Sequence, residues 1–151
     1  MINTFLNFKT KNIVSQSFDL EEIQSANKVL FSLFTRYGDT IIDLVIIKEF
    51  IEYNPDKEYL ILCPRQMQPY ANELLPDIKC IALNKRNLFD MFKINQKLKK
   101  WKPDVGFNPW SNGLDSCYFI TYCRIFFCYK DFDRPDVINH YQVVRRYLQL
   151  P

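Results

Sequence analysis

Short apolar segments alternate with longer amphipathic segments along most of the chain. The apolar segments predict strands at Val29–Phe34, Tyr59–Cys63, Ile78–Leu83, Asp104–Asn108 and Arg124–Tyr129. The segments between them predict helices from about Thr40 to Tyr53, over Met67–Leu74, over Leu88–Trp101 and from near Gly113 onward. Strands that are apolar almost throughout and alternate with helices are typical of a parallel sheet covered on both faces.

This alternation predicts an α/β protein with a Rossmann-like, doubly wound parallel sheet in a single three-layer domain, because crossovers between parallel strands are nearly always right-handed. We expect the domain to span residues 28–137. Residues 1–27 are polar and weakly patterned, and we interpret them as an N-terminal extension with a short helix around Asp19–Ser25. Residues 138–151 carry apolar side chains at helical spacing and should form a terminal helix.

The placement of the glycines indicates one edge of this sheet. The chain has only three: Gly38 follows the first strand, Gly106 lies within the fourth, and Gly113 follows the fourth. In the common strand order 3-2-1-4-5 the first and fourth strands are neighbours whose connections leave in opposite directions. Ligands of open α/β sheets bind at this switch point. Glycine there either allows a ligand to approach the backbone or relieves a tight turn between strand and helix, and the sequence favours neither interpretation.

Asp39 follows Gly38 directly, where the chain enters its first long helix. As an N-cap, its carboxylate would accept backbone N–H groups of that helix. As a functional group, it would project into the switch-point cleft and take a proton from a bound hydroxyl. The helix N-terminus and Arg36 both favour the ionised carboxylate, which weakens a base but still allows proton transfer as a new bond forms. Arg36, Gly38 and Thr40 are the neighbouring candidates for binding a ligand.

The loop after the fourth strand, NPWSNG, should face Asp39 across the switch point. Trp110 can stack on a sugar ring, Ser111 and Asn112 can hydrogen-bond its hydroxyls, and Gly113 follows them. An ordinary proline-containing turn, with Trp110 covering the edge of the core, explains the same residues. The first loop has neither the GxGxxG pattern of dinucleotide sites nor the GxxxxGK[ST] pattern of phosphate loops, so no cofactor is expected.

Composition and charge exclude several classes of protein. An apolar fraction of 48% and an aromatic fraction of 16% argue against disorder. The net charge of +3 is too mild to indicate nucleic-acid binding, and we interpret Lys97, Lys99 and Lys100 as solvated charge. No apolar run approaches the roughly 20 residues of a membrane-spanning helix. The five cysteines form no CxxC pair, which favours buried free thiols in a reducing cytoplasm over a metal cluster.

Three ordered segments resemble the first domain of glycosyltransferase family 9, the heptosyltransferases of lipopolysaccharide core synthesis. KVLFSLFTRYGDTIIDLVIIKEFIEYNPDKEYLILCP is similar to the family's opening: a strand, a loop ending in Gly-Asp, an apolar helix and Asn-Pro-Asp before the second strand. LKKWKPDVGFNPWSNGLDSCYFITYCR is similar to a later family segment through Asp104, Gly113, Leu114 and Ser116. NHYQVVRRYLQLP resembles the helix that ends the family's first domain. The resemblance covers about residues 28–151.

The resemblance implies the arrangement called GT-B, in which one Rossmann-like domain binds a saccharide acceptor and a second binds the nucleotide-sugar donor. It implies that Asp39 is the catalytic base, which deprotonates an acceptor hydroxyl as this attacks the anomeric carbon with inversion. No metal takes part. It further implies a cytoplasmic enzyme of lipopolysaccharide or cell-surface polysaccharide synthesis, without a nucleic-acid partner and with peripheral membrane contact left open.

The chain departs from the family in two respects. It ends at Pro151, where the family continues into the donor-binding domain, so we expect no sugar transfer by these 151 residues alone. Thr-Arg-Tyr before Gly38 is bulkier than the small residues frequent in the family, which leaves the donor and acceptor sugars open. One alternative is a single-domain sugar-binding or interaction module without activity. An unrelated flavodoxin-like module is disfavoured, because no hydroxyl-rich phosphate loop follows the first strand.

Overall fold

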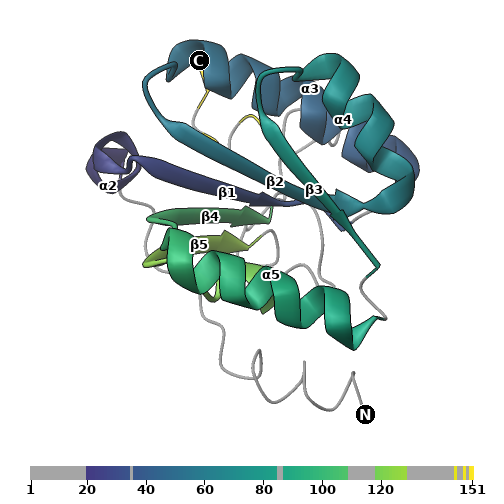
Figure 1. Ribbon diagram of the computed structural model, residues 1–151. Helices are drawn as coiled ribbons and strands as arrows, with labels where there is room; N and C mark the ends of the chain where they lie inside the picture. The colour runs from purple at the N-terminus through teal and green to yellow at the C-terminus, as the bar shows by residue number, and fades with distance from the viewer. Residues whose placement is uncertain are drawn as a thin grey trace.

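The computed structural model describes residues 20–34, 36–84, 87–108 and 118–128, together with 145, 148, 150 and 151. Its centre is a five-stranded, all-parallel sheet in the order β3-β2-β1-β4-β5 (Figure 1). The strands are β1 (Lys28–Ser32), β2 (Glu58–Pro64), β3 (Lys79–Leu83), β4 (Val105–Asn108) and β5 (Ile125–Cys128). The helices are α2 (Leu20–Ser25), α3 (Tyr37–Tyr53), the 3₁₀ turn η1 (Arg65–Met67), α4 (Gln68–Leu74) and α5 (Leu88–Trp101).

Helices cover both faces of this sheet, which confirms the Rossmann-like, doubly wound α/β fold that the sequence predicts. α3 and α4 pack on one face and α5 packs on the other (Figure 1). Along β1, Phe31 points to the α3 side and Leu30 to the α5 side, as the alternation of a strand requires. Because the central strands are buried on both faces, their sequences are apolar almost throughout.

The elements agree with the predicted ones except near their ends. β1 ends at Ser32 instead of Phe34, and α3 begins at Tyr37, three residues before the predicted start. The predicted helix over Met67–Leu74 is a 3₁₀ turn that continues into α4. Pro69 lies in the first turn of α4, where the backbone N–H that proline lacks would have no partner within the helix. α5 has the predicted bounds because Asn87 caps it, accepting the N–H groups of Phe89 and Asp90 at 3.0 and 3.4 Å.

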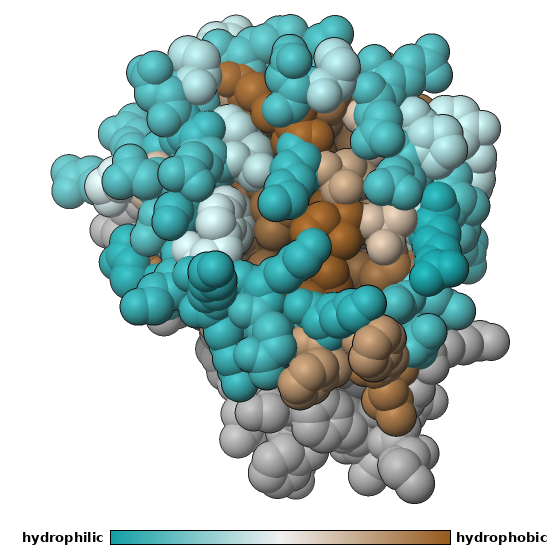
Figure 2. Space-filling view, viewed as in Figure 1, coloured by the Kyte–Doolittle hydropathy of each residue, from teal (hydrophilic) through white to brown (hydrophobic). Residues whose placement is uncertain are grey.

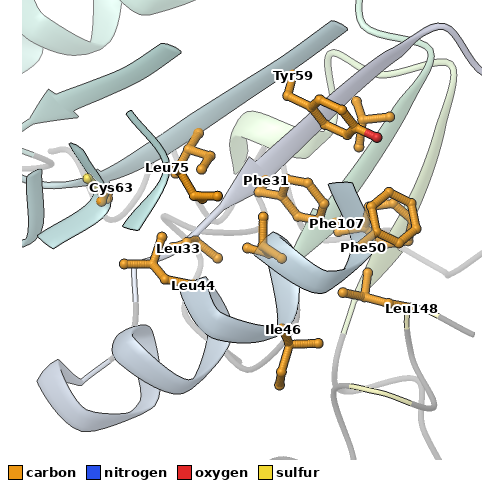
Figure 3. Close-up of a cluster of buried hydrophobic side chains, with 14 of the residues drawn as sticks. Phe31, Leu33, Leu44, Ile46, Phe50, Tyr59, Cys63, Leu75, Phe107 and Leu148 are labelled. Carbon is orange, nitrogen blue, oxygen red and sulfur yellow. The ribbon is translucent and has the colours of Figure 1, made fainter. Parts of the chain in front are cut away.

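Aromatic side chains form the centre of the core between the sheet and α3 (Figure 3). The Phe31 ring stacks on Phe107 of the neighbouring strand, with centroids 5.5 Å apart, and meets the edge of Phe50 from α3 at 5.8 Å. Tyr59 of β2 lies against the same rings, at 6.4 Å from Phe31. Such pairs add about 0.5–1.5 kcal/mol each to the free energy of burial. They hold the C-terminal part of α3 against β1.

The C-terminal end of the chain packs on the same core. Leu148 is buried in it, and Arg145 forms an ion pair with Glu49 of α3. The predicted terminal helix over residues 138–151 and the helix predicted from near Gly113 fall largely outside the described residues, although residues 118–120 are helical. In the described part of the chain, no helix is both long and apolar enough to cross a membrane.

Candidate functional site

The sheet order places the predicted switch point between β1 and β4. These strands are parallel neighbours, paired from Val29 with Val105 to Phe31 with Phe107. The chain leaves β1 through α3 towards β2 on one side, and α5 returns it to β4 on the other. The carboxyl ends of β1 and β4 therefore meet at one edge, as predicted, and α3 begins directly beyond it.

Asp39 lies in the first turn of α3 at this edge, and its side chain is half-buried. Of the two interpretations of Asp39, the N-cap is wrong, because Arg36 occupies that position with extended backbone (φ −70°, ψ 160°) and makes no side-chain cap hydrogen bond. Asp39 is the third residue of α3. The helix dipole favours a negatively charged side chain at this position. The carboxylate thus lies in the first turn of α3, beside the mouth of the switch point.

Thr40 has a different position from the one expected for a ligand-binding residue. Its side chain is fully buried, and its hydroxyl donates to the backbone carbonyl of Arg36 at 3.1 Å. The Thr40 N–H donates to the same carbonyl at 3.0 Å. Thr40 therefore closes the first turn of α3, which contains Gly38 and Asp39.

The two described glycines have separate roles. Neither has a positive φ, so neither is required by its backbone conformation. A Cβ on Gly38 would meet no atom within 4 Å, which leaves open space beside Asp39. A Cβ on Gly106 would lie 2.5 Å from Cys123 Sγ and 3.0 Å from Ile120 Cβ. The interpretation of Gly106 as a place of ligand approach is wrong, because side chains of the segment before β5 fill that space.

The second predicted loop of the site lies outside the described residues. It contains Trp110, Ser111, Asn112 and Gly113, and their part in binding stays a prediction. The described chain reaches this loop at Asn108, the last residue of β4, whose side chain is fully buried. The register of β1 and β4 makes Ser32 and Asn108 the next pair after Phe31 and Phe107, so two buried polar residues end the paired strands.

The same edge carries residues that the sequence did not single out. Tyr37 and Tyr70 pack edge to face, with ring centroids 5.4 Å apart, and are 47% and 39% exposed. The hydrogen bond to Tyr70 is the main cause that raises the pKa of the Tyr37 hydroxyl. Asp43, one turn after Asp39, is fully buried. Asp43 could have been found from the sequence, because it is a carboxylate on the apolar face of a predicted helix. The Tyr37–Tyr70 contact could not, because no local pattern connects these two residues.

A charged pair joins two loops at this edge. Arg65 Nη2, just after β2, lies 3.1 Å from Asp90 Oδ2 in the first turn of α5. Asp90 Oδ2 also accepts the N–H of Asn84, at 3.2 Å. The Arg65 side chain is 66% exposed, so solvent screens the pair and it contributes little stability.

Cys63, Cys80 and Cys123 are free thiols, as predicted. Cys63 and Cys123 are buried and Cys80 is half-buried. The Sγ atoms of Cys63 and Cys80 are 3.2 Å apart, and their hydrogen bond raises the pKa of Cys63 and lowers that of Cys80. Burial raises the pKa of the Cys123 thiol. Among the described residues, no three His, Cys, Asp or Glu side chains lie close enough together to hold a metal ion.

Comparisons with known proteins add no relative. No protein-family model, no curated protein and no solved structure matches this chain. The candidate site therefore depends on the geometry of the switch point and on the sequence pattern around Asp39.

Proposed function

We propose that this chain is the acceptor-binding domain of a glycosyltransferase, which transfers a sugar from a nucleotide-sugar donor to a saccharide acceptor in lipopolysaccharide or cell-surface polysaccharide synthesis. The observation that carries the proposal is the position of Asp39. Its half-buried side chain lies in the first turn of α3, which begins beyond the carboxyl end of β1, the strand that pairs with β4. The resemblance of the surrounding sequence to glycosyltransferase family 9 supports the same role.

In this proposal Asp39 is the general base. An acceptor hydroxyl lies against its carboxylate and loses its proton to it as the hydroxyl oxygen attacks the anomeric carbon of the donor. The new C–O bond forms while the bond to the nucleotide breaks on the opposite side, so the configuration inverts. Proton transfer that is concerted with bond formation requires no strong base, so a carboxylate can serve.

The neighbouring residues suit a saccharide. Aromatic rings contact the apolar faces of sugars. Tyr37, on the turn that carries Asp39, forms an exposed pair with Tyr70 of α4. The open space beside Gly38 lets a sugar ring approach the first turn of α3. Arg36 and the loop with Trp110, Ser111 and Asn112 complete the proposed acceptor site.

The nucleotide sugar would be bound by a second Rossmann-like domain facing this edge. Donor and acceptor must be held together in attack geometry for a useful rate. The proposal places the enzyme in the cytoplasm, where nucleotide sugars are available, with its acceptor at the membrane surface.

A second candidate is a sugar-binding module without activity. The exposed Tyr37–Tyr70 pair favours it, because that pair can bind a saccharide whether or not Asp39 transfers a proton. The two candidates share the acceptor site and differ in whether the carboxylate of Asp39 is needed chemically.

The test uses the Asp39→Asn variant in two assays. In the first, the chain is combined with its donor-binding domain and transfer of a radiolabelled sugar to an inner-core oligosaccharide is measured. The variant should lower kcat by about 10²–10⁴-fold, the usual loss for a general base. In the second, saturation-transfer NMR on the chain alone should show unchanged oligosaccharide binding. The Asp56→Asn variant, in an exposed turn, is the matched control.

The outcomes separate the candidates. Loss of transfer with retained binding supports the enzyme. Binding that persists while no preparation transfers sugar supports the module. An oligosaccharide that fails to bind the unaltered chain contradicts both.

A further inference from the structure

A cavity of about 690 Å³ lies at the edge of the sheet opposite to Asp39. It is formed where the amino ends of β1, β2 and β3 meet the C-terminal end of α5. We call it the lysine groove. Figure 2 shows the face that contains these elements, with apolar surface at its centre and hydrophilic side chains around it. The groove is therefore neither a purely polar hollow nor a simple apolar patch.

The groove exists because α5 covers less than the whole width of the sheet. Met91, Ile94 and Leu98 of α5 are buried over the central strands. β3 is an edge strand, and its Ile81 is only partly buried. Ile81 forms an apolar floor that remains accessible between β3 and α5, with the buried Leu60 of β2 beside it.

Trp101 forms a wall of the groove that is fixed in place. Its indole N–H donates to Glu58 Oε2 at 3.2 Å, and its side chain is half-buried beside the floor. The hydrogen bond joins the indole ring to the first residue of β2, and both residues line the groove. A fixed, half-exposed indole beside an aliphatic floor suits a flat or aliphatic group.

Lysines dominate the charge of the lining. Five line the groove, against two carboxylates: Lys28, Lys57, Lys79, Lys97 and Lys100, with Glu58 and Asp77. Lys28 Nζ and Lys57 Nζ donate to backbone carbonyls, of Trp101 at 3.2 Å and of Ala26 at 2.6 Å. The difference, five minus two, leaves a formal charge of +3 around one cavity.

Three of these lysines are exposed at the rim. Lys97 and Lys100 are three residues apart on α5 and share a face, while Lys79 lies across the groove at the start of β3. The ion pairs between described residues join Arg65 to Asp90 and Arg145 to Glu49, so within that part of the chain no rim lysine is paired. Compensation of the α5 dipole explains a lysine in its last turn, but it does not explain those from the strands.

We propose that the lysine groove binds a small organic anion, whose apolar body lies on Leu60 and Ile81 beside Trp101 and whose anionic group is held by Lys79, Lys97 and Lys100. The chemistry that recognises it is a phosphate, sulfonate or carboxylate joined to an aromatic or aliphatic group. Because the groove and Asp39 lie at opposite edges of the sheet, this site is independent of the proposed acceptor site.

The test titrates the chain with anilinonaphthalene sulfonate, an aromatic anion that fluoresces in apolar surroundings. The double variant Lys97→Gln/Lys100→Gln should weaken binding by about fivefold or more, since charged hydrogen bonds at a partly dry site are lost. Lys93→Gln/Lys99→Gln removes the same charge from the same helix outside the groove and should leave binding unchanged. High salt should weaken binding to the unaltered chain.

A second pair of variants tests the apolar floor. Ile81→Ser should weaken the fluorescent complex, whereas Phe89→Ser/Phe92→Ser, at exposed apolar positions elsewhere on α5, should not. Circular dichroism melting checks that each variant is folded. In NMR spectra the indole N–H of Trp101, assigned with a Trp110→Phe variant, should shift on titration of the unaltered chain.

Three results would overturn the proposal. The first is that the uncharged parent phenylnaphthylamine binds equally well. The second is that fluorescence is lost in the Phe89/Phe92 variant and not in the lysine variant. The third is that the Trp101 resonance does not shift at saturation.

Discussion

Asp104 Oδ2 accepts the backbone N–H of Lys28 at 2.9 Å, and the backbone N–H of Asp104 donates to the carbonyl of Lys28, also at 2.9 Å. The same carboxylate oxygen accepts the N–H of Asn27 at 3.0 Å. The residue before β4 is thus bonded to the first residue of β1, which aligns the two strands whose far ends form the candidate site. Asp104 is one of the residues through which the sequence resembles glycosyltransferase family 9. In this structure its role is to join the starts of β1 and β4.

We expect Asp104→Ala to lower the free energy of unfolding by about 2–3 kcal/mol, because two N–H groups lose a charged acceptor at a partly buried position. Asp104→Asn should retain most of this stability, since one amide oxygen can accept both bonds. Urea denaturation of both variants measures the difference, with Asp56→Ala as an exposed control. Equal stability of the alanine and asparagine variants would show that these bonds are unimportant.

The two described glycines should respond to alanine with opposite signs. Gly106→Ala should destabilise the protein by about 1–3 kcal/mol, because its Cβ would lie 2.5 Å from Cys123 Sγ. Gly38→Ala should stabilise it by up to about 1 kcal/mol, since Gly38 is helical and the added methyl group meets nothing. The same alanine should weaken saccharide binding if the open space holds the acceptor. Thermal melts and NMR titrations of both variants check these signs.

Tyr59 should make the protein sensitive to alkali. Burial raises the pKa of its hydroxyl above the usual value, and this hydroxyl donates to the carbonyl of Asn54 at 2.5 Å. The protonated form is favoured in the folded state, so its stabilising effect is complete below about pH 10 and is lost as pH rises above that value.

Tyr59→Phe should therefore cost about 1 kcal/mol near neutral pH, where the hydrogen bond is lost. This difference from the unaltered chain should shrink as pH rises above about 10, because the phenylalanine has no proton to lose. Unfolding free energies of both proteins across this range provide the test. A difference that stays constant with pH would show that Tyr59 does not titrate in the unfolding reaction.

The tyrosine pair at the candidate site should matter for binding more than for folding. Tyr37→Ala and Tyr70→Ala each remove an exposed ring of the pair and should weaken oligosaccharide binding by about 5–10-fold, as expected for one aromatic contact. Tyr53→Ala, at the other end of α3 and 60% exposed, is the control and should bind normally. Saturation-transfer NMR measures all three, and equal losses in the control would point to a general effect of the helix.

The sequence by itself determined the elements and the class of fold. Apolar runs of strand length and the helical spacing of α5 are local patterns, because the alternation of a strand and the turn of a helix repeat within a few residues. The strand order also followed, because right-handed crossovers and strands buried on both faces leave few arrangements. The sequence pattern also placed Asp39 at the carboxyl edge of the sheet, which needed only the order of the elements.

Tertiary structure decided what local patterns cannot specify. α3 begins at Tyr37 because Thr40 closes its first turn on Arg36, so Asp39 is not the cap. Gly106 faces Cys123, and Tyr37 meets Tyr70, because packing brings together residues far apart in sequence. The lysine groove likewise gathers side chains from three strands and one helix. Each of these depends on which side chains oppose each other across elements, and that information exists only once the sheet has formed.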